Sequence, residues 1–183
     1  MINRFLAFIL IVSIAPVFLI IAAFIFFEDG MPIFFQQKRV GINYIFFQIY
    51  KFRTMKKGTP NVATHLLQNP DQYLLKVGKI LRKLSLDELP NLLNIIKGEM
   101  VFVGPRPALY NQDDLMDLRV EAGVDILKPG ITGLAQINGR DEISLEKKVA
   151  YELEYLERRS FLFDVKIILK TFANVLLSKG IKH

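Results

Sequence analysis

The chain begins with a long apolar run and then changes to shorter patterned segments. From Phe5 to Phe27 it carries 23 residues and no charge. As an α-helix this run would be about 35 Å long, and a hydrocarbon core is about 30 Å thick. A signal peptide would have a shorter apolar core and a small-residue cleavage site. The pattern therefore predicts a permanent membrane anchor.

Pro16 stands near the middle of this run. A proline removes one helix hydrogen bond and clashes with the preceding turn, although membrane helices tolerate it. The residue pattern leaves two arrangements open. One is a kinked helix that spans the membrane, and the other is a re-entrant helix whose two ends face the same side.

After the anchor, strand-like and helix-like patterns alternate. Two β-rich runs within residues 33–55 flank the sequence GINY and predict a hairpin. Short strands are expected within 100–107 and 128–140, where proline and glycine mark turns. Apolar residues at helical spacing predict helices over 71–84, over 145–159 after a Ser144 N-cap, and over 161–180. The last helix has a wide apolar stripe that suits either a core or a membrane interface.

Composition narrows the possible functions. The net charge is +6, and nearly all Lys and Arg residues follow residue 37, so the body of the protein is expected on the cytoplasmic side. Cysteine is absent and only two histidines occur, which argues against a zinc cluster or a histidine-based triad. No nucleic-acid motif is present, and an anionic membrane surface accounts equally well for the basic charge.

Two adjacent acidic residues, Asp87 and Glu88, stand between a basic segment and an apolar one. One interpretation is structural, because Ser85 and Glu88 have the spacing of a capping box. Pro90 conflicts with that register, and a helix that begins at Pro90 suits proline better. Either register places the carboxylates near a helix N-terminus.

The other interpretation is chemical. Arg82, Arg106 and Arg140 occur in nearby motifs, and arginine is well suited to binding phosphate. Carboxylates among arginines also suit Mg²⁺, which usually binds through one or two carboxylates plus substrate phosphates. An aspartate can itself accept a phosphoryl group.

Six motifs in order give a resemblance that covers nearly the whole chain. They are PIFFQQKRVG, YKFRTM, LRKLSLDELPNLLNIIKGEM, VGPRP, KPGITGLAQINGR and FLFDVKIILKT. In these the chain resembles the bacterial sugar transferases, the small monotopic polyprenyl-phosphate phosphoglycosyl transferases.

The resemblance implies an activity. A sugar-1-phosphate would pass from a UDP-sugar to undecaprenyl phosphate with release of UMP, at the cytoplasmic face of the bacterial inner membrane. Asp87 would be the nucleophile and a ligand of Mg²⁺, with Glu88 as its partner in the dyad. The basic positions of the family's active site fall on Lys51, Arg82, Arg106 and Arg140.

The resemblance also implies an architecture. The fold would be α+β and mostly helical, with a re-entrant membrane helix over 1–28 and a catalytic domain over 29–183. A small β-hairpin and in-plane amphipathic helices would belong to that domain. Two rivals remain: direct transfer through a ternary complex without a covalent intermediate, and a non-catalytic scaffold that binds anionic lipid.

Overall fold

A computed structural model describes residues 1–60, 69–139 and 143–177. Helix and sheet are mixed, and 57% of the structure is helical. The helices are α1 (Ile2–Asp29), α2 (Lys76–Lys83), α3 (Asn91–Lys97), α4 (Asp113–Glu121), α5 (Leu134–Ile137), α6 (Leu145–Arg158) and α7 (Phe161–Leu176). Short 3₁₀ segments are η1 (Ile42–Tyr44), η3 (Pro70–Tyr73) and η4 (Leu86–Glu88). The strands are β1 (Phe34–Val40), β2 (Phe46–Phe52), β3 (Val101–Val103), β4 (Ala108–Leu109) and β5 (Gly130–Thr132).

The strands form two small sheets. The first has the order β2-β1-β4, and β1 pairs with both neighbours in antiparallel fashion. The predicted hairpin is therefore confirmed, with Phe34 opposite Phe52 and a 3₁₀ turn at its tip. In the second sheet β3 pairs with β5 in parallel. The expected short strands are present, but residues 134–137 turn into the short helix α5.

Glycines allow the second sheet to approach its neighbouring loop closely. A Cβ atom on Gly130 would lie 2.2 Å from the backbone nitrogen of Gly104. A Cβ atom on Gly133 would lie 2.1 Å from the carbonyl oxygen of Gly104. These separations are far below van der Waals contact, so the GPRP and GITG segments depend on residues without side chains here.

The helix predicted over 71–84 is shorter than expected. Residues 70–73 form a 3₁₀ turn, Leu74 makes an isolated β-bridge with Met55, and α2 begins only at Lys76. The bridge holds Leu74 in an extended conformation, so tertiary pairing overrides the helical pattern. The Ser144 N-cap is confirmed, because its hydroxyl oxygen accepts a hydrogen bond from the Lys147 N–H.

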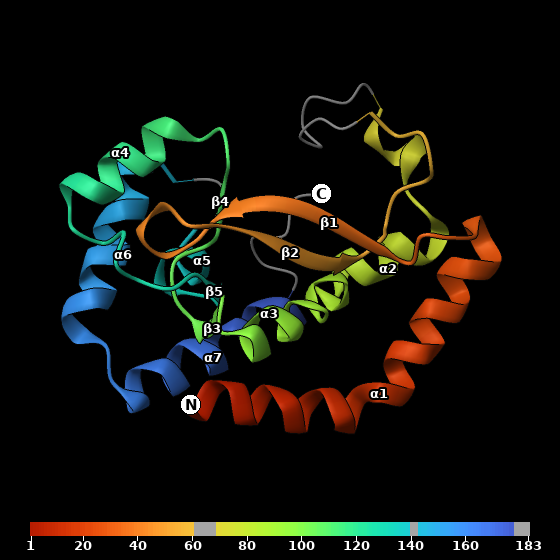
Figure 1. Ribbon diagram of the computed structural model, residues 1–183, viewed down its shortest axis with the longest axis horizontal. Helices are drawn as coiled ribbons and strands as arrows, with labels where there is room; N and C mark the ends of the chain where they lie inside the picture. The colour runs from red at the N-terminus through yellow and green to blue at the C-terminus, as the bar shows by residue number, and fades with distance from the viewer. Residues whose placement is uncertain (61–68, 140–142, 178–183) are drawn as a thin grey trace.

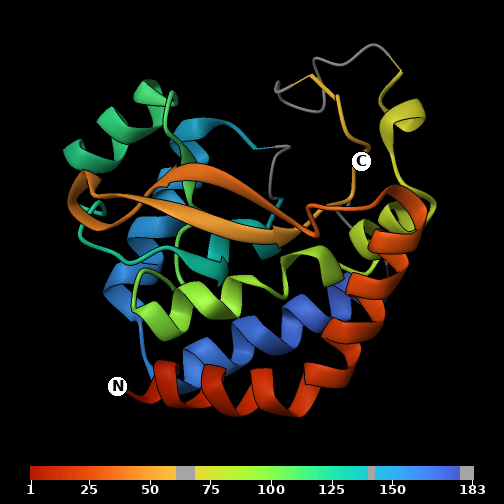
Figure 2. The same cartoon turned by 45° about the vertical axis from the view of Figure 1, so that its right-hand side comes forward.

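The helix α1 is one apolar element, long and apolar enough to cross a membrane. Figure 1 shows that it bends near its middle, where Pro16 lies inside the helix. Its first half packs through Ala7, Ile11 and Ile14 against a cluster that includes Ile95 of α3. In Figures 1 and 2 this half and α7 lie at the same end of the molecule.

The second half of α1 contacts a different part of the same body. Ile21 and Ile25 belong to a core cluster with Phe52, Leu75 and Leu81. Most of the helix surface nevertheless remains exposed, since only 11% of its most apolar window is buried. An exposed apolar surface of this extent is typical of a segment surrounded by lipid.

The C-terminal end of α1 is bonded to the rest of the protein through two carboxylates. Glu28 accepts hydrogen bonds from the backbone N–H groups of Lys76, at 2.6 Å, and Val77, at 3.1 Å. It therefore caps the N-terminus of α2 from a distant part of the chain. Asp29 forms an ion pair with Arg53, which lies just after β2 and is almost fully buried.

Replacing Glu28 is expected to weaken this junction. Glu28→Ala leaves two N–H groups of α2 without their acceptor and should lower the free energy of unfolding by about 1 kcal/mol. Thermal unfolding in one detergent would measure the change. Asp71→Ala is the control, because its ion pair with Lys79 spans 3.6 Å and is exposed, so its loss should have almost no effect. Equal shifts in the two variants would contradict the capping role.

Candidate active site

The acidic pair lies on the short 3₁₀ segment η4, directly before α3. The capping-box interpretation is wrong, because Ser85 has a left-handed backbone (φ 55°) and its side chain makes no cap hydrogen bond. Pro90 instead occupies the N-cap position of α3, close to the later helix start. Proline suits this place because its missing N–H would have no partner within the helix.

Among the described residues, two cations from separate elements bind Glu88. Its Oε1 atom lies 2.6 Å from the Nζ atom of Lys51 on β2 and 3.6 Å from the NH1 atom of Arg106. The Glu88 side chain is only 13% exposed, so these contacts compensate the loss of hydration of its charge. The three residues line one shallow, solvent-open pocket.

Asp87 has a different electrostatic environment from its neighbour. It makes no ion pair within 4.0 Å with any residue in the described part of the chain. Burial raises the pKa of the Asp87 carboxyl, and the charge of Glu88 adds to this. The charges of Lys51 and Arg82 act in the opposite direction. Asp87 is thus a partly buried carboxylate near cations that do not bind it directly.

The loop between β3 and β4 presents Arg106 to the pocket and is fixed by three backbone acceptors. The carbonyl of Pro105 accepts from the Gly130 N–H at 2.8 Å. The carbonyl of Arg106 accepts from the guanidinium of Arg119 at 3.0 Å, and that of Pro107 from Arg39 at 3.0 Å. Since proline has no N–H, carbonyl bonds are the main way to fix this segment.

Arg119 belongs to a buried ion pair behind the site. It joins α4 to Glu152 of α6 through two hydrogen bonds of 2.8 and 2.5 Å, and both residues are at most 5% exposed. The pair therefore supports the backbone of Arg106. Sequence reasoning missed Arg119, because an arginine inside an acidic helical segment gives no sign that it is buried.

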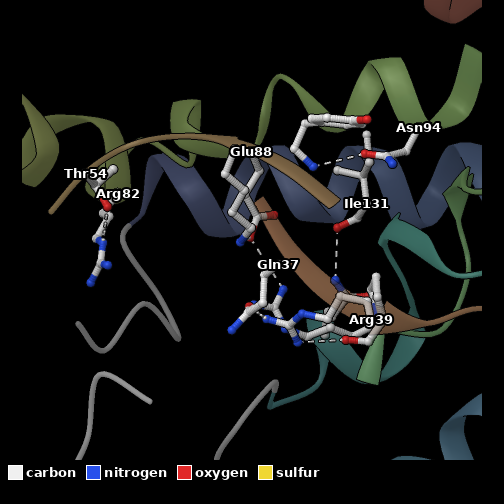
Figure 3. A network of polar contacts seen from close by, with 12 residues as sticks. Gln37, Arg39, Thr54, Arg82, Glu88, Asn94 and Ile131 are labelled. Atoms are coloured by element: carbon white, nitrogen blue, oxygen red, sulfur yellow. Dashed lines mark hydrogen bonds and ion pairs between the residues drawn. The ribbon is translucent and has the colours of Figure 1, made fainter. Parts of the chain in front are cut away.

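The two remaining predicted site residues are Arg82 and Arg140. Arg82 donates a 3.0 Å hydrogen bond to the Thr54 hydroxyl. Figure 3 shows it to one side of the cluster that contains Glu88 and Arg39. It acts on Asp87 through its charge, and burial lowers its own pKa. Arg140 lies outside the described residues.

The pocket also contains oxygen atoms that suit Mg²⁺. Within the described ranges no three His, Cys, Asp or Glu residues form a metal-binding group, but Mg²⁺ usually needs only one or two carboxylates beside water and phosphate. The Asn91 Oδ1 atom is buried, lines the pocket and has no hydrogen-bond partner among described residues. Glu88 lines the same pocket, so a carboxylate and an amide oxygen, both hard donors of the kind that Mg²⁺ takes, are present there, whereas Asp87, the predicted ligand, is not among the residues that line it.

The fold and site together define a class of protein. An exposed apolar helix is joined to a body whose pocket carries the Glu88 carboxylate beside Lys51 and Arg106. This combination is typical of membrane-associated proteins that bind phosphorylated ligands. A family model described as bacterial sugar transferase matches residues 1–178. The chain therefore belongs to the bacterial sugar transferase family.

Individual relatives extend this finding. The chain is 42% identical over 183 residues to the exopolysaccharide production protein ExoY of Rhizobium meliloti, covering 91% of this chain and 80% of the relative. It is 46% identical to the uncharacterized sugar transferase EpsL of Bacillus subtilis, and the match covers 84% of this chain and 75% of EpsL. It is 38% identical to a UDP-glucose:undecaprenyl-phosphate glucose-1-phosphate transferase of Caulobacter vibrioides, and the match covers 88% of this chain and 63% of that relative.

The environment of Asp87 generates a stability prediction. A raised pKa means that the folded state binds the proton more tightly than the unfolded state, so stability falls as pH rises through the folded pKa. At pH 7.5 the ionised Asp87 should therefore destabilise the fold, and Asp87→Asn should raise the Tm in metal-free buffer. The increase in Tm of Asp87→Asn over the wild type should become smaller as the pH falls to the usual aspartate pKa of 3.8 and below it.

Thermal unfolding at several pH values measures this effect. Asp117→Asn, at an exposed position of α4, is the matched control and should leave the Tm unchanged. A lower Tm for Asp87→Asn at neutral pH would show that the charge of Asp87 stabilises the fold, contrary to the direction given by its burial.

Proposed function

We propose that this protein transfers a sugar-1-phosphate from a UDP-sugar to undecaprenyl phosphate and releases UMP. The reaction would take place at the cytoplasmic face of a bacterial inner membrane. Family membership supports the reaction class, because several relatives are named as undecaprenyl-phosphate sugar phosphotransferases. The proposal is for UDP-sugars as a class, since these relatives are named for different sugars.

The proposal rests on the difference in ion pairing between Asp87 and Glu88. Glu88 is engaged by Lys51 and Arg106, whereas Asp87 has no ion pair among the described residues. A carboxylate that is ionised at neutral pH needs no general base to act as a nucleophile. Its raised pKa makes it a more basic carboxylate than usual, and basicity favours attack.

The first step would be attack by an Asp87 carboxylate oxygen on the β-phosphorus of the UDP-sugar. A bond forms between this oxygen and phosphorus, and the bond from phosphorus to the bridging oxygen of UMP breaks. UMP leaves with the electron pair. The product is a sugar-phosphoryl-aspartate. Arg106 and Lys51 would balance the negative charge that gathers on the phosphoryl oxygens.

The second step would regenerate the carboxylate. A phosphate oxygen of undecaprenyl phosphate attacks the same phosphorus, and the bond from phosphorus to Asp87 breaks. Two half-reactions let a soluble donor and a lipid acceptor use one small pocket in turn. Mg²⁺, with Asp87 as its protein ligand, would supply charge neutralisation for the diphosphate.

We further infer that α1 is re-entrant. A straight helix of 28 residues would be about 42 Å long and would separate its ends across the bilayer. Near the N-terminus, Arg4 donates a 2.6 Å hydrogen bond to the carbonyl of Ile96 on α3. At the other end Glu28 caps α2. Both ends bind the same body, which favours the re-entrant arrangement over the spanning one.

Release of UMP tests the proposed activity. Purified protein in lipid nanodiscs is expected to release UMP from at least one member of a panel of UDP-sugars, in the presence of Mg²⁺ and polyprenyl phosphate. Covalent transfer gives ping-pong kinetics, with parallel lines in double-reciprocal plots. Intersecting lines would favour the ternary-complex rival. No UMP from any donor, with protein that is folded, would favour the lipid-binding scaffold.

The membrane arrangement has its own test. The chain has no cysteine, so Asn3→Cys provides a single thiol at the start of α1. We expect a membrane-impermeant maleimide to label it in inverted vesicles and not in intact cells. Glu121→Cys, at an exposed position of α4, is the control for the cytoplasmic side. Labelling of Asn3→Cys in intact cells would mean that α1 spans the membrane.

A further inference from the structure

The strand β2 lies at the edge of its sheet, and a helix rather than another strand meets its outer side. The sheet order β2-β1-β4 leaves one edge of β2 without a strand partner. A row of unpaired N–H and C=O groups is costly unless something covers it. Here the covering element is α3, which begins three residues after the acidic pair.

One side chain of α3 pairs with this edge as a strand would. Asn94 is fully buried. Its Oδ1 atom accepts a 3.2 Å hydrogen bond from the N–H of Tyr50, the dashed line at Asn94 in Figure 3. Its Nδ2 atom donates a 2.6 Å bond to the carbonyl of Gln48. The two partners flank Ile49, so one amide group satisfies a donor and an acceptor on the same edge.

Neighbouring contacts fix the orientation of this amide. The Nδ2 atom of Asn94 also donates a 2.7 Å hydrogen bond to the Glu99 carboxylate. A backbone N–H needs an oxygen and a carboxylate needs a donor, so the amide can adopt only one of its two orientations. Lys97, one turn further along α3, donates a 2.6 Å bond to the Tyr50 hydroxyl.

The part of β2 that Asn94 binds leads directly into the site. Lys51 follows Tyr50 on β2, and Glu88 precedes α3 by three residues. Their 2.6 Å contact joins the two elements that Asn94 holds together. A shift of about 1 Å in a catalytic contact can lower a rate by about 100-fold. The docking of β2 on α3 would therefore affect activity through the Lys51–Glu88 contact.

We propose that Asn94 is a positioning residue that sets the contact between Lys51 and Glu88 by acting as a substitute strand on the edge of β2. Its effect on catalysis rests on the proposed function, whereas its effect on the contact does not. The amide does not touch the substrate, so its influence is expected through Lys51 and Glu88 alone.

Two readouts test this role. The first is kcat for UMP release, which should fall by about 10- to 100-fold in Asn94→Ala. The second is zero-length carbodiimide coupling, which joins a carboxylate to an amine in direct contact. Mass spectrometry should find the peptide of Lys51 linked to that of Glu88 in the wild type, at much lower yield in Asn94→Ala.

The matched control is Ile95→Ala on the same helix. Ile95 is also fully buried and shares an apolar cluster with Phe47 and Ile49 of β2, but its side chain makes no polar bond to this strand. This control therefore separates the loss of apolar packing between α3 and β2 from the loss of the amide hydrogen bonds. Its replacement should lower the Tm at least as much and leave both readouts near wild type for folded protein. If Asn94→Ala does not fold, Asn94→Asp with Glu99→Gln keeps the acceptor for Tyr50 and should give intermediate values.

The outcomes separate the two proposals. Wild-type coupling and kcat in a folded Asn94 variant, or equal losses in Ile95→Ala, would overturn the positioning role. If no protein releases UMP but coupling falls only in the Asn94 variants, the positioning role stands and the proposed function fails.

Discussion

The contact that the rest of the site depends on is the one that Glu88 makes with Lys51 and Arg106. Two adjacent carboxylates in a partly buried place repel each other, and both lose hydration. Lys51 from β2 and Arg106 from the β3–β4 loop compensate Glu88, which leaves Asp87 without a direct ion partner among the described residues. The hairpin, the proline-framed loop and α3 meet where this compensation occurs.

Each element that contributes a charged side chain to the site is held in place by hydrogen bonds from residues outside the site. Asn94 holds β2 against α3, and the Arg119–Glu152 pair supports the backbone of Arg106. The anchor takes part as well, because Glu28 caps α2, the helix that carries Arg82. In the proposed membrane arrangement, such connections would keep the pocket at a constant position relative to the lipid surface.

The sequence predicted the long apolar N-terminal segment, the hairpin and the Ser144 cap, because each depends on a local pattern. It failed where tertiary contacts decide. The β-bridge of Leu74 shortened α2, and the left-handed backbone of Ser85 removed the expected capping box. The sequence also pointed to Lys51 and Arg106, which the structure brings together at Glu88. Arg39, Asn94 and Arg119 carried no such signal, since burial and backbone partners are not visible in a residue pattern.

The most direct test of this account is the mass of the protein after incubation with a UDP-sugar and Mg²⁺ alone, without any lipid acceptor. The account predicts one added phosphosugar on the peptide that contains Asp87, released UMP in equal amount, and no addition to Asp87→Asn. A label on another residue would contradict the assignment of the nucleophile. Absence of any adduct, with UMP formed only after polyprenyl phosphate is added, would contradict the covalent mechanism.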